Sequence, residues 1–350
     1  MSPTHVAAVR SGRTTVRSHP RVAVTGSGTA LGTALLLQLR EQFSAQSVVA
    51  LDDTVDLCDP SVAQALAGAD VLVHAVAEPG GGSAGAQRVL RTAQTLLTAA
   101  AAVAVPRVVL ITTAMVYGAR ADNPVPLPED APLQAEGMGP LIDEILEVER
   151  LAARAGEVHP GLRVTVVRPA MLVGPGVVGL AARHFSATRL LAVRGTRPCW
   201  QFCHVADLAA LVSLVVAEDV VGPLTVASEG WLEQAEVERL AGSPRIELPA
   251  SLAFTTAARL HRLGVLVGTP GALAYVVHPW VVPSTRARRA GWNPAYDNAA
   301  LLRQVLDQVA VTSSPGHRWE AKDAAIGATG AAVAMAGTAA LVRAARRRRR

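Results

Sequence analysis

The sequence predicts an α/β fold with a doubly wound parallel sheet, followed by a small C-terminal substrate or lid subdomain. Two features of the chain predict it. Short, nearly continuous apolar runs alternate with longer segments of helical periodicity, as in parallel sheets whose two faces are covered by helices. A glycine-rich turn also separates the first apolar run from the first helical segment. With 350 residues, half of them hydrophobic, the chain is long enough to bury such a core.

The first strand is predicted at residues 22–24, within RVAVTGSGTALGTALLLQLREQF. A turn follows at residues 25–28, and residues 30–43 have helical periodicity. Three glycines bracket this junction: Gly26, Gly28 and Gly32. Glycines there let the backbone approach a pyrophosphate, which the N–H groups and dipole of the helix N-terminus hold. This is the Rossmann-type arrangement, although such a turn also serves as a plain tight connection.

The segment SVVALDD is predicted as a second buried strand that ends in Asp52 and Asp53. A carboxylate about twenty residues past the glycine turn accepts the ribose hydroxyls of adenosine and repels a 2′-phosphate. No arginine follows directly to receive such a phosphate, so NAD is favoured over NADP. The alternative is a solvated acid at the end of a strand.

Three more strands are predicted, at residues 71–76 and within PRVVLITTAMVYG and LRVTVVRPAMLVGPG. Each follows a helical segment such as AQRVLRTAQTLLTAAAAVA. Ligands of such sheets bind at the carboxyl ends of the strands. Those ends are predicted at Gly26, Asp52, Ala77, Thr113 and Pro169.

The chain is expected to divide into five parts. Residues 1–20 form a disordered N-terminal extension, because they are basic and have too few apolar residues to pack. The other parts are an NAD-binding Rossmann core at 21–180, the remaining strands with the substrate or lid subdomain at 181–310, a linker at 311–323, and an apolar Ala/Gly-rich helix with a poly-arginine end at 324–350.

The distribution of charge argues against a nucleic-acid partner. The net charge is +5, but Arg343 and Arg346–Arg350 supply six positive charges at the extreme C-terminus. The rest of the chain is therefore close to neutral, and it shows no basic patch with interleaved aromatic residues. Nucleic-acid binding is excluded as the main function.

The cysteines indicate neither a disulfide framework nor a metal site. The chain has three, Cys58, Cys199 and Cys203. His204 lies beside Cys203, but no second pair of ligands follows at the spacing of a zinc site. We expect reduced thiols, no metal, and a cytoplasmic location.

The C-terminal segment suggests contact with a membrane surface. Residues 324–342 are uncharged and long enough to span a bilayer, but their hydrophobicity is marginal. A single span after a cytosolic domain would place the arginines outside, against the positive-inside preference. We therefore expect residues 324–350 to lie on the anionic inner leaflet, with a loosely ordered helix as the alternative.

Several motifs, taken together, resemble the extended short-chain dehydrogenase/reductases of the NAD-dependent epimerase/dehydratase family. They cover roughly residues 21–310 and occur in the family's order: TGSGTALG, DLCDP, VLVHAVA, TTAMVYG, VRPAMLVGPG, FCHVADLAALV and RARRAGWNP. The resemblance is greatest to nucleotide-sugar epimerases such as UDP-glucose 4-epimerase. It implies NAD as cofactor, with NADP less favoured, a nucleotide-sugar substrate and a homodimer.

The resemblance also implies a set of cofactor-binding residues. They are Gly26, Gly28, Thr29, Ala30, Leu31, Gly32, Asp52, Asp56, Leu57, Ala75, Val76, Ala77, Thr112, Pro169 and Ala170. One of them departs from the family pattern, because Thr29 replaces the middle glycine of TGxxGxxG and Gly28 comes one place early. The Cβ of Thr29 would crowd the pyrophosphate, while its hydroxyl could donate to it.

A second departure concerns catalysis. In this family the helix after the VYG strand reads Y-x-x-x-K-x-x-x-E. Aligning that glutamate with Glu149 puts Ile145 at the lysine position and Leu141 at the tyrosine position. The only lysine of the chain is Lys322. The chain has three tyrosines, Tyr117, Tyr275 and Tyr296, and none of them is followed by a lysine four residues later.

An aliphatic pair cannot do the work of that motif. The family's tyrosine exchanges a proton with the substrate hydroxyl, while the lysine lowers its pKa and holds the nicotinamide ribose. Loss of positioned acid–base catalysis removes about 10² to 10⁴ in rate. The candidate catalytic residues are then Thr113, at the family's Ser/Thr position, and Asp143 as a replacement base. Glu144 and Glu147 are alternative replacement bases. His74 is expected to have a structural role and not to act as a base.

Two functions remain open from the sequence. The chain is either an epimerase, dehydratase or reductase of a nucleotide-linked sugar with a non-standard base, or a cofactor-binding module that regulates a partner.

Overall fold

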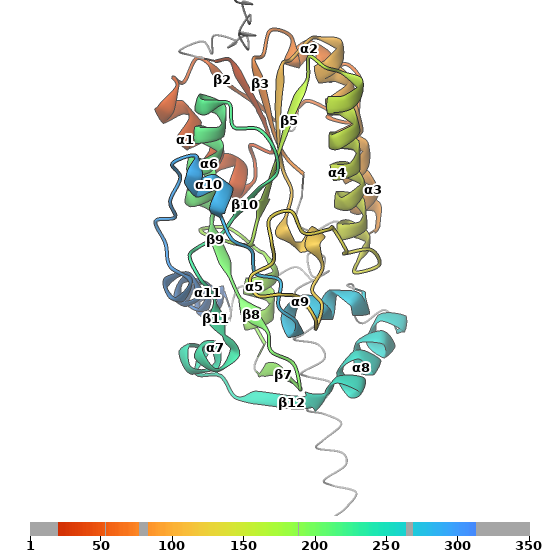
Figure 1. Cartoon of the computed structure of the whole chain (residues 1–350), viewed down its shortest axis with the longest axis vertical. Coiled ribbons are helices and arrows are strands. Elements are labelled where there is room, and N and C mark those ends of the chain that lie inside the picture. Colours follow the sequence, from red (N-terminus) through yellow and green to blue (C-terminus); the bar gives the residue numbers. More distant parts are fainter. Residues whose placement is uncertain (1–19, 53, 77–82, 188, 264–268, 313–350) are drawn as a thin grey trace, which may run out of the picture.

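The computed structural model describes residues 20–52, 54–76, 83–187, 189–263 and 269–312 (Figure 1). The N-terminal extension and the C-terminal helix expected from the sequence lie outside these residues. Two predicted residues at strand ends, Asp53 and Ala77, also lie outside them.

The core of the fold is a parallel sheet of six strands in the order β10-β5-β4-β3-β1-β2. Its strands are β1 (Val22–Thr25), β2 (Val48–Leu51), β3 (Val71–Ala75), β4 (Arg107–Ile111), β5 (Arg163–Pro169) and β10 (Leu224–Val226). Valine, leucine and isoleucine dominate these strands because helices cover both faces. The predicted parallel α/β fold is confirmed, and β10 adds an edge strand that the sequence analysis did not predict.

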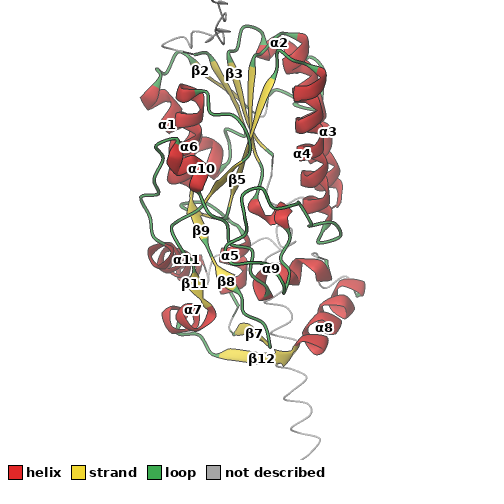
Figure 2. Cartoon of the chain, in the orientation of Figure 1, coloured by secondary structure: helices red, strands yellow, loops and turns green. Residues whose placement is uncertain are grey.

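Helices form a layer on each face of this sheet (Figures 1 and 2). On one face, α1 (Ala30–Gln42) packs against α6 (Val205–Glu218). On the other, α3 (Ser83–Ala102) packs against α4 (Pro140–Val158), and α2 (Val62–Leu66) packs against α3. Apolar side chains such as Leu35 and Leu39 of α1 are fully buried between helix and sheet.

The strand order contains one reversal, between β1 and β3. From β1 the chain crosses to β2 on one side, and it then returns to β3 on the other side of β1. The connections at the carboxyl ends of these two strands therefore diverge, and doubly wound sheets bind their ligands at such a reversal.

A smaller region lies beyond the carboxyl ends of the strands, in the lower half of Figure 1. Three short strand pairs organise it: β6 (Met171–Val173) with β9 (Phe202–His204), β7 (Leu190–Arg194) with β12 (Arg245–Pro249), and β8 (Cys199–Trp200) with β11 (Leu232–Glu233). Its helices are η1 (Ala114–Tyr117), α5 (Leu180–Phe185), α7 (Gln234–Ala241), α8 (Ala250–Arg262), η2 (Pro270–Leu273), α9 (Ala274–Val277) and α11 (Asn298–Thr312). One more short helix, α10 (Thr285–Arg289), packs against β10.

Within the described part of the chain, no helix has the length and apolar character needed to cross a membrane.

Candidate functional site

The glycine turn joins β1 to α1 through a very close backbone contact. A Cβ placed on Gly32 would lie 1.9 Å from the carbonyl oxygen of Gly26, so only glycine fits at position 32. Gly26 has φ +70°, a conformation that favours glycine. Gly28 is exposed at the top of the turn. Gly26 and Gly32 thus bring the turn against the first turn of α1.

Thr29 is the N-cap of α1, and its hydroxyl is fully engaged. It donates to the Gly26 carbonyl at 2.8 Å and accepts from the Gly32 N–H at 3.0 Å. The hydroxyl therefore caps the helix instead of pointing its proton at a pyrophosphate. At the start of α1, the N–H groups of Ala30 and Leu31 remain as donors for an anion.

The loop after β6 closes over the same helix end. A Cβ on Gly176 would come within 3.4 Å of the Ala30 Cβ, and one on Gly174 would come within 2.4 Å of the Val205 Cγ2. The loop at residues 173–176 thus runs between the N-termini of α1 and α6. Pro169 and Ala170, which precede it, are buried.

Asp52 stands beside the glycine turn, because Leu51 of β2 pairs with Thr25 of β1. Its side chain is exposed, and its Oδ1 accepts hydrogen bonds from the N–H and hydroxyl of Thr54. The hydrogen bond from the Thr54 hydroxyl contributes most to lowering the pKa of Asp52, and the one from the Thr54 N–H lowers it further. A charged, exposed carboxylate can accept a ribose hydroxyl.

Other predicted cofactor-binding residues lie at or after the ends of β2 and β3. Asp56 is exposed and Leu57 is half-buried against the core. Ala75 is half-buried, and Val76 is buried, with its N–H donated to the carbonyl at the end of β4. Ala77 lies outside the described residues.

Thr113 and Thr112 end β4 and point to different partners. Thr113 is the N-cap of η1, and its half-buried hydroxyl accepts from the Met115 N–H at 3.2 Å. That contact leaves the hydroxyl proton of Thr113 for a ligand. The Thr112 hydroxyl donates instead to Glu149 Oε1 at 2.7 Å, so this proton is not available to a cofactor.

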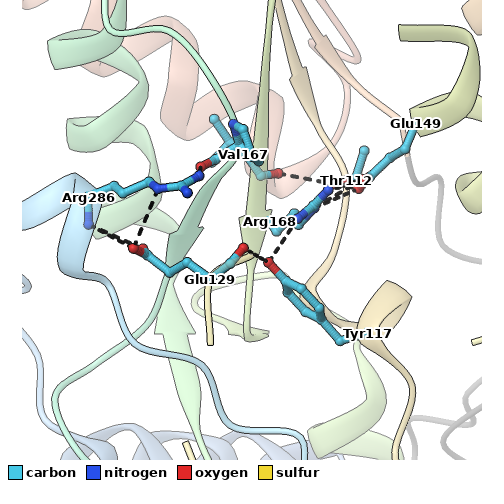
Figure 3. Close-up of polar contacts among 8 residues, drawn as sticks. Thr112, Tyr117, Glu129, Glu149, Val167, Arg168 and Arg286 are labelled. Carbon is cyan, nitrogen blue, oxygen red and sulfur yellow. Dashed lines mark hydrogen bonds and ion pairs between the residues drawn. The ribbon is translucent and has the colours of Figure 1, made fainter. Parts of the chain in front are cut away.

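Glu149 fixes the register of α4 against the sheet (Figure 3). The Nε of Arg168 on β5 donates to both carboxylate oxygens of Glu149, at 3.1 and 3.0 Å, and its Nη2 donates to Oε2. Since α4 has 3.6 residues per turn, Ile145 and Leu141 lie on the same face, one and two turns nearer its N-terminus. Ile145 is buried in the core, whereas Leu141 is half-buried.

The same arginine continues a buried polar network that the sequence did not reveal (Figure 3). Arg168 Nη1 donates to the Tyr117 hydroxyl at 2.8 Å, which donates to the Glu129 carbonyl at 2.8 Å. The Glu129 carboxylate accepts from the Arg286 N–H at 3.2 Å. Burial raises the pKa of Tyr117, which stays protonated. The network ties α10, η1, β5 and α4 together beneath the carboxyl edge.

Two other titratable candidates have structural partners. His74 is buried with its Nδ1 2.7 Å from the Thr25 hydroxyl, and burial lowers its pKa to about 4. A neutral histidine held in this way fits the predicted structural role. Asp143 Oδ1 accepts from the Gly137 N–H at 2.7 Å, and no hydrogen bond joins Asp143 to Thr113 in the described structure. Burial, with the charges of Glu147 and Asp143, raises the pKa of Glu144.

A cavity of about 170 Å³ lies in the smaller region, against the β7–β12 pair. Its lining comes from β7 and the turn after it (residues 191–196 and Pro198), from Gln234 and Glu238 of α7, from Arg245 and Glu247 of β12, and from Val276 of α9. No sequence motif marks it, because four elements far apart in the chain build it.

Comparison with known proteins agrees with this geometry. The model of the NAD dependent epimerase/dehydratase family matches residues 22–225, more than half of the chain. The chain belongs to that family. The family is named for its dependence on NAD, the cofactor that the sequence predicted. The match begins at β1 and ends within β10, so it contains the glycine turn, Asp52, Thr113 and Glu149.

Relatives and solved structures of this family extend the likeness. The chain is 24% identical over 260 residues to an uncharacterized protein of Mycobacterium tuberculosis, covering 66% of this chain and 69% of that one. The UDP-glucose 4-epimerase of Thermus thermophilus in complex with NAD is 17% identical, with a TM-score of 0.60 over 83% of this chain and 99% of that one. MoeE5 in complex with UDP-glucuronic acid and NAD is 19% identical, with a TM-score of 0.61 over the same shares. At these identities the structures show the fold.

Proposed function

We propose that this family member binds NAD across the carboxyl ends of β1 and β3, and binds a nucleotide-linked sugar without the tyrosine–lysine proton transfer of its family. The observation that carries the proposal is the face of α4. Glu149 occupies the glutamate position of the motif and is fixed by Thr112 and Arg168, so the two preceding turns present Ile145 and Leu141. Both side chains are aliphatic and can neither accept nor donate a proton.

The cofactor part of the proposal rests on the α1 end and on Asp52. The N–H groups of Ala30 and Leu31 and the helix dipole would hold the pyrophosphate. Asp52 would accept the adenosine ribose hydroxyls and would repel the 2′-phosphate of NADP. Bound NAD supplies a hydride acceptor. Thr113, which follows β4, would donate a hydrogen bond from its hydroxyl to an oxygen of a ligand beside the cofactor.

The nucleotide-sugar part rests on the cavity beside β7. Its volume of about 170 Å³ is near the ~150 Å³ of an engineered cavity that binds benzene, so it accommodates one aromatic ring. Polar side chains of α7 and β12 line it, which suits the base of a nucleotide better than an apolar ring. UDP-glucose 4-epimerase and MoeE5 with UDP-glucuronic acid share this fold.

The tyrosines of the chain support the loss of the proton-transfer pair. The Tyr117 hydroxyl donates to the Glu129 carbonyl and the Tyr275 hydroxyl to the Met115 carbonyl, each at 2.8 Å. Burial raises the pKa of both phenols. Tyr296, the third, stacks on a histidine ring at 3.9 Å. The hydrogen bonds of Tyr117 and Tyr275 to backbone carbonyls support the proposed loss of the family's general base.

The test is turnover of UDP-glucose and UDP-galactose by NAD-loaded protein. We expect NAD to bind and interconversion to lie about 10² to 10⁴ below that of a family member with the pair. Native mass spectrometry of the purified protein would show any NAD or nucleotide sugar that co-purifies. Interconversion at the rate of such a family member would refute the proposal.

A second candidate function is catalysis with a replacement base. The free proton of the Thr113 hydroxyl favours it, and Asp143, in the first turn of α4, is the candidate base. This function predicts measurable turnover that is lost in both Thr113→Ala and Asp143→Asn. A regulatory module instead predicts cofactor binding with no turnover before or after either substitution.

We also propose that residues 324–350 attach the protein to an anionic membrane surface and that the chain forms a homodimer. The support for the membrane contact is the arginine-rich end beside a long uncharged segment. The homodimer is proposed from the family resemblance alone.

A further inference from the structure

Residues 269–282, which we call the strap, contain η2, α9 and the extended chain after them. The strap begins with a backbone contact to the loop before α4. A Cβ placed on Gly271 would lie 2.9 Å from the Gly137 carbonyl oxygen and 2.9 Å from the Met138 Cα. The Thr269 hydroxyl donates to the Met138 carbonyl at 3.0 Å. The first turn of the strap is therefore seated on the N-terminal end of α4.

The middle of the strap is fastened to η1. Tyr275 is fully buried, and its hydroxyl donates to the carbonyl of Met115, two residues after Thr113. The Trp280 Nε1 donates to the Tyr275 carbonyl at 2.9 Å, and the two rings meet edge to face at 5.6 Å. These contacts hold the Tyr275 ring against the element that carries Thr113.

The end of the strap is fastened to the loop that leaves η1. The Asn123 amide donates to the Pro279 carbonyl at 2.8 Å, and the Leu127 N–H donates to the Val281 carbonyl at 2.8 Å. The strap is thus attached at its start by the Thr269 hydroxyl and close packing, and at its end by the Asn123 side chain and the Leu127 N–H. In its middle, the Tyr275 hydroxyl donates to the Met115 carbonyl, and the buried side chains of Tyr275, Val276 and Val277 pack in the core.

The strap lies between two places that a nucleotide-linked sugar would occupy. Val276 lines the cavity beside β7, and the preceding residue, Tyr275, contacts η1 next to Thr113. Figure 1 shows α9 between the carboxyl edge of the large sheet and the β7–β12 pair. A ligand with its base in the cavity and its sugar at Thr113 would cross the position of α9, where Tyr275 and Val276 are buried.

We propose that the strap holds the sugar-binding path closed, and that a nucleotide-linked sugar binds only when α9 moves off η1. The proposal rests on the proposed function, since it assumes that such a sugar is the ligand. Binding is then limited by the fraction of molecules in which the strap is open. Weakening one latch hydrogen bond raises that fraction, and hence the apparent affinity, by about two- to tenfold.

Two variants weaken the strap in different ways. Tyr275→Phe removes the hydrogen bond to Met115 and keeps the buried ring. Gly271→Ala wedges a methyl group against the backbone of Gly137 and Met138. Gly161→Ala is the matched control, because a Cβ there meets nothing within 4 Å and its φ is not in the left-handed region.

The experiment is calorimetric titration of UDP-glucose into the NAD-loaded full-length protein and the three variants. We expect Tyr275→Phe and Gly271→Ala to bind UDP-glucose about two- to tenfold more tightly than wild type, and the control to match wild type. NAD affinity should be the same in all four.

Other outcomes separate the strap from the function on which it rests. If both weakened variants bind UDP-glucose no more tightly than wild type, the strap does not limit binding and the proposal is overturned. If none of the four proteins binds UDP-glucose, the nucleotide-sugar assignment itself fails, and the role of the strap fails with it.

Discussion

The buried pair of Glu149 and Arg168 should be among the most sensitive points of the fold. Their side chains are 3% and 10% exposed, and they share three hydrogen bonds. Glu149→Gln keeps the shape of the side chain but removes its charge, which leaves the Arg168 guanidinium buried without a counter-charge. Breaking a buried pair by removing one partner costs about 3–5 kcal/mol. We expect Glu149→Gln and Arg168→Met each to lower the free energy of unfolding by that amount.

The double variant Glu149→Leu/Arg168→Met should be less destabilised than the sum of Glu149→Leu and Arg168→Met measured separately. With both charges removed, neither is left buried without a partner, and replacing a whole buried pair by apolar residues is often neutral or stabilising. A surface pair provides the control. Arg150 and Glu136 are 2.6 Å apart but 45% and 57% exposed, so Glu136→Gln should cost at most about 1 kcal/mol.

Urea unfolding followed by circular dichroism measures these differences. With a slope of about 1–3 kcal/mol per molar urea, a loss of 3–5 kcal/mol moves the midpoint by at least 1 M. The reasoning is refuted if Glu149→Gln shifts the midpoint no more than Glu136→Gln does, or if the double variant shows the full sum of its two single variants. Either result would mean that water or a local rearrangement screens the pair.

Three other predictions concern the cofactor, pH and the C-terminus. In calorimetric titrations, Asp52→Ala should lower the affinity of the protein for NAD and reduce the ratio of its NAD affinity to its NADP affinity. Equal affinities of the wild-type protein for the two cofactors would contradict the ribose contact. Burial lowers the pKa of His74 and of His184 to about 4, while the unfolded chain binds these protons below about pH 6.5. The free energy of unfolding should therefore fall by about 3 kcal/mol per histidine as the pH is lowered from 6.5 to 4. In His184→Phe the urea midpoint should fall less steeply with decreasing pH than in wild type. An equal fall in the two proteins would contradict a neutral, buried His184 ring. Truncation at residue 322 should leave urea stability and NAD affinity unchanged. It should abolish salt-sensitive sedimentation with anionic vesicles, since each arginine near such a surface contributes about 1 kcal/mol to binding. A full-length protein that does not sediment with these vesicles at low salt would rule out the membrane contact.

Much of the fold follows from local sequence. The runs at β1, β3 and β4 are valine-rich and bounded by glycine or proline, so their strand character and parallel pairing can be predicted. The first turn is equally local, because Gly32 must lack a Cβ to pass Gly26. The strand β10 has only three residues, too few to show a period, and it was missed for that reason.

The candidate site was predictable only where it is built from one segment. The Thr29 hydroxyl shows the limit, since a sequence does not reveal that helix capping uses both its donor and its acceptor. The bond between Glu129 and Arg286 joins residues 157 positions apart, and no local pattern announces it. The strap and the cavity depend in the same way on tertiary packing.

The most direct measurement of the central claim is the rate of UDP-galactose to UDP-glucose conversion by the NAD-loaded, full-length protein. A UDP-glucose 4-epimerase of the family, such as that of Thermus thermophilus, serves as the positive control. On the proposed alignment of Glu149, which puts Leu141 and Ile145 where the family keeps its proton-transfer pair, NAD should be bound while conversion lies about 10² to 10⁴ below the control. Conversion at the control's rate that persists in Thr113→Ala and Asp143→Asn would contradict the claim and place the active site elsewhere.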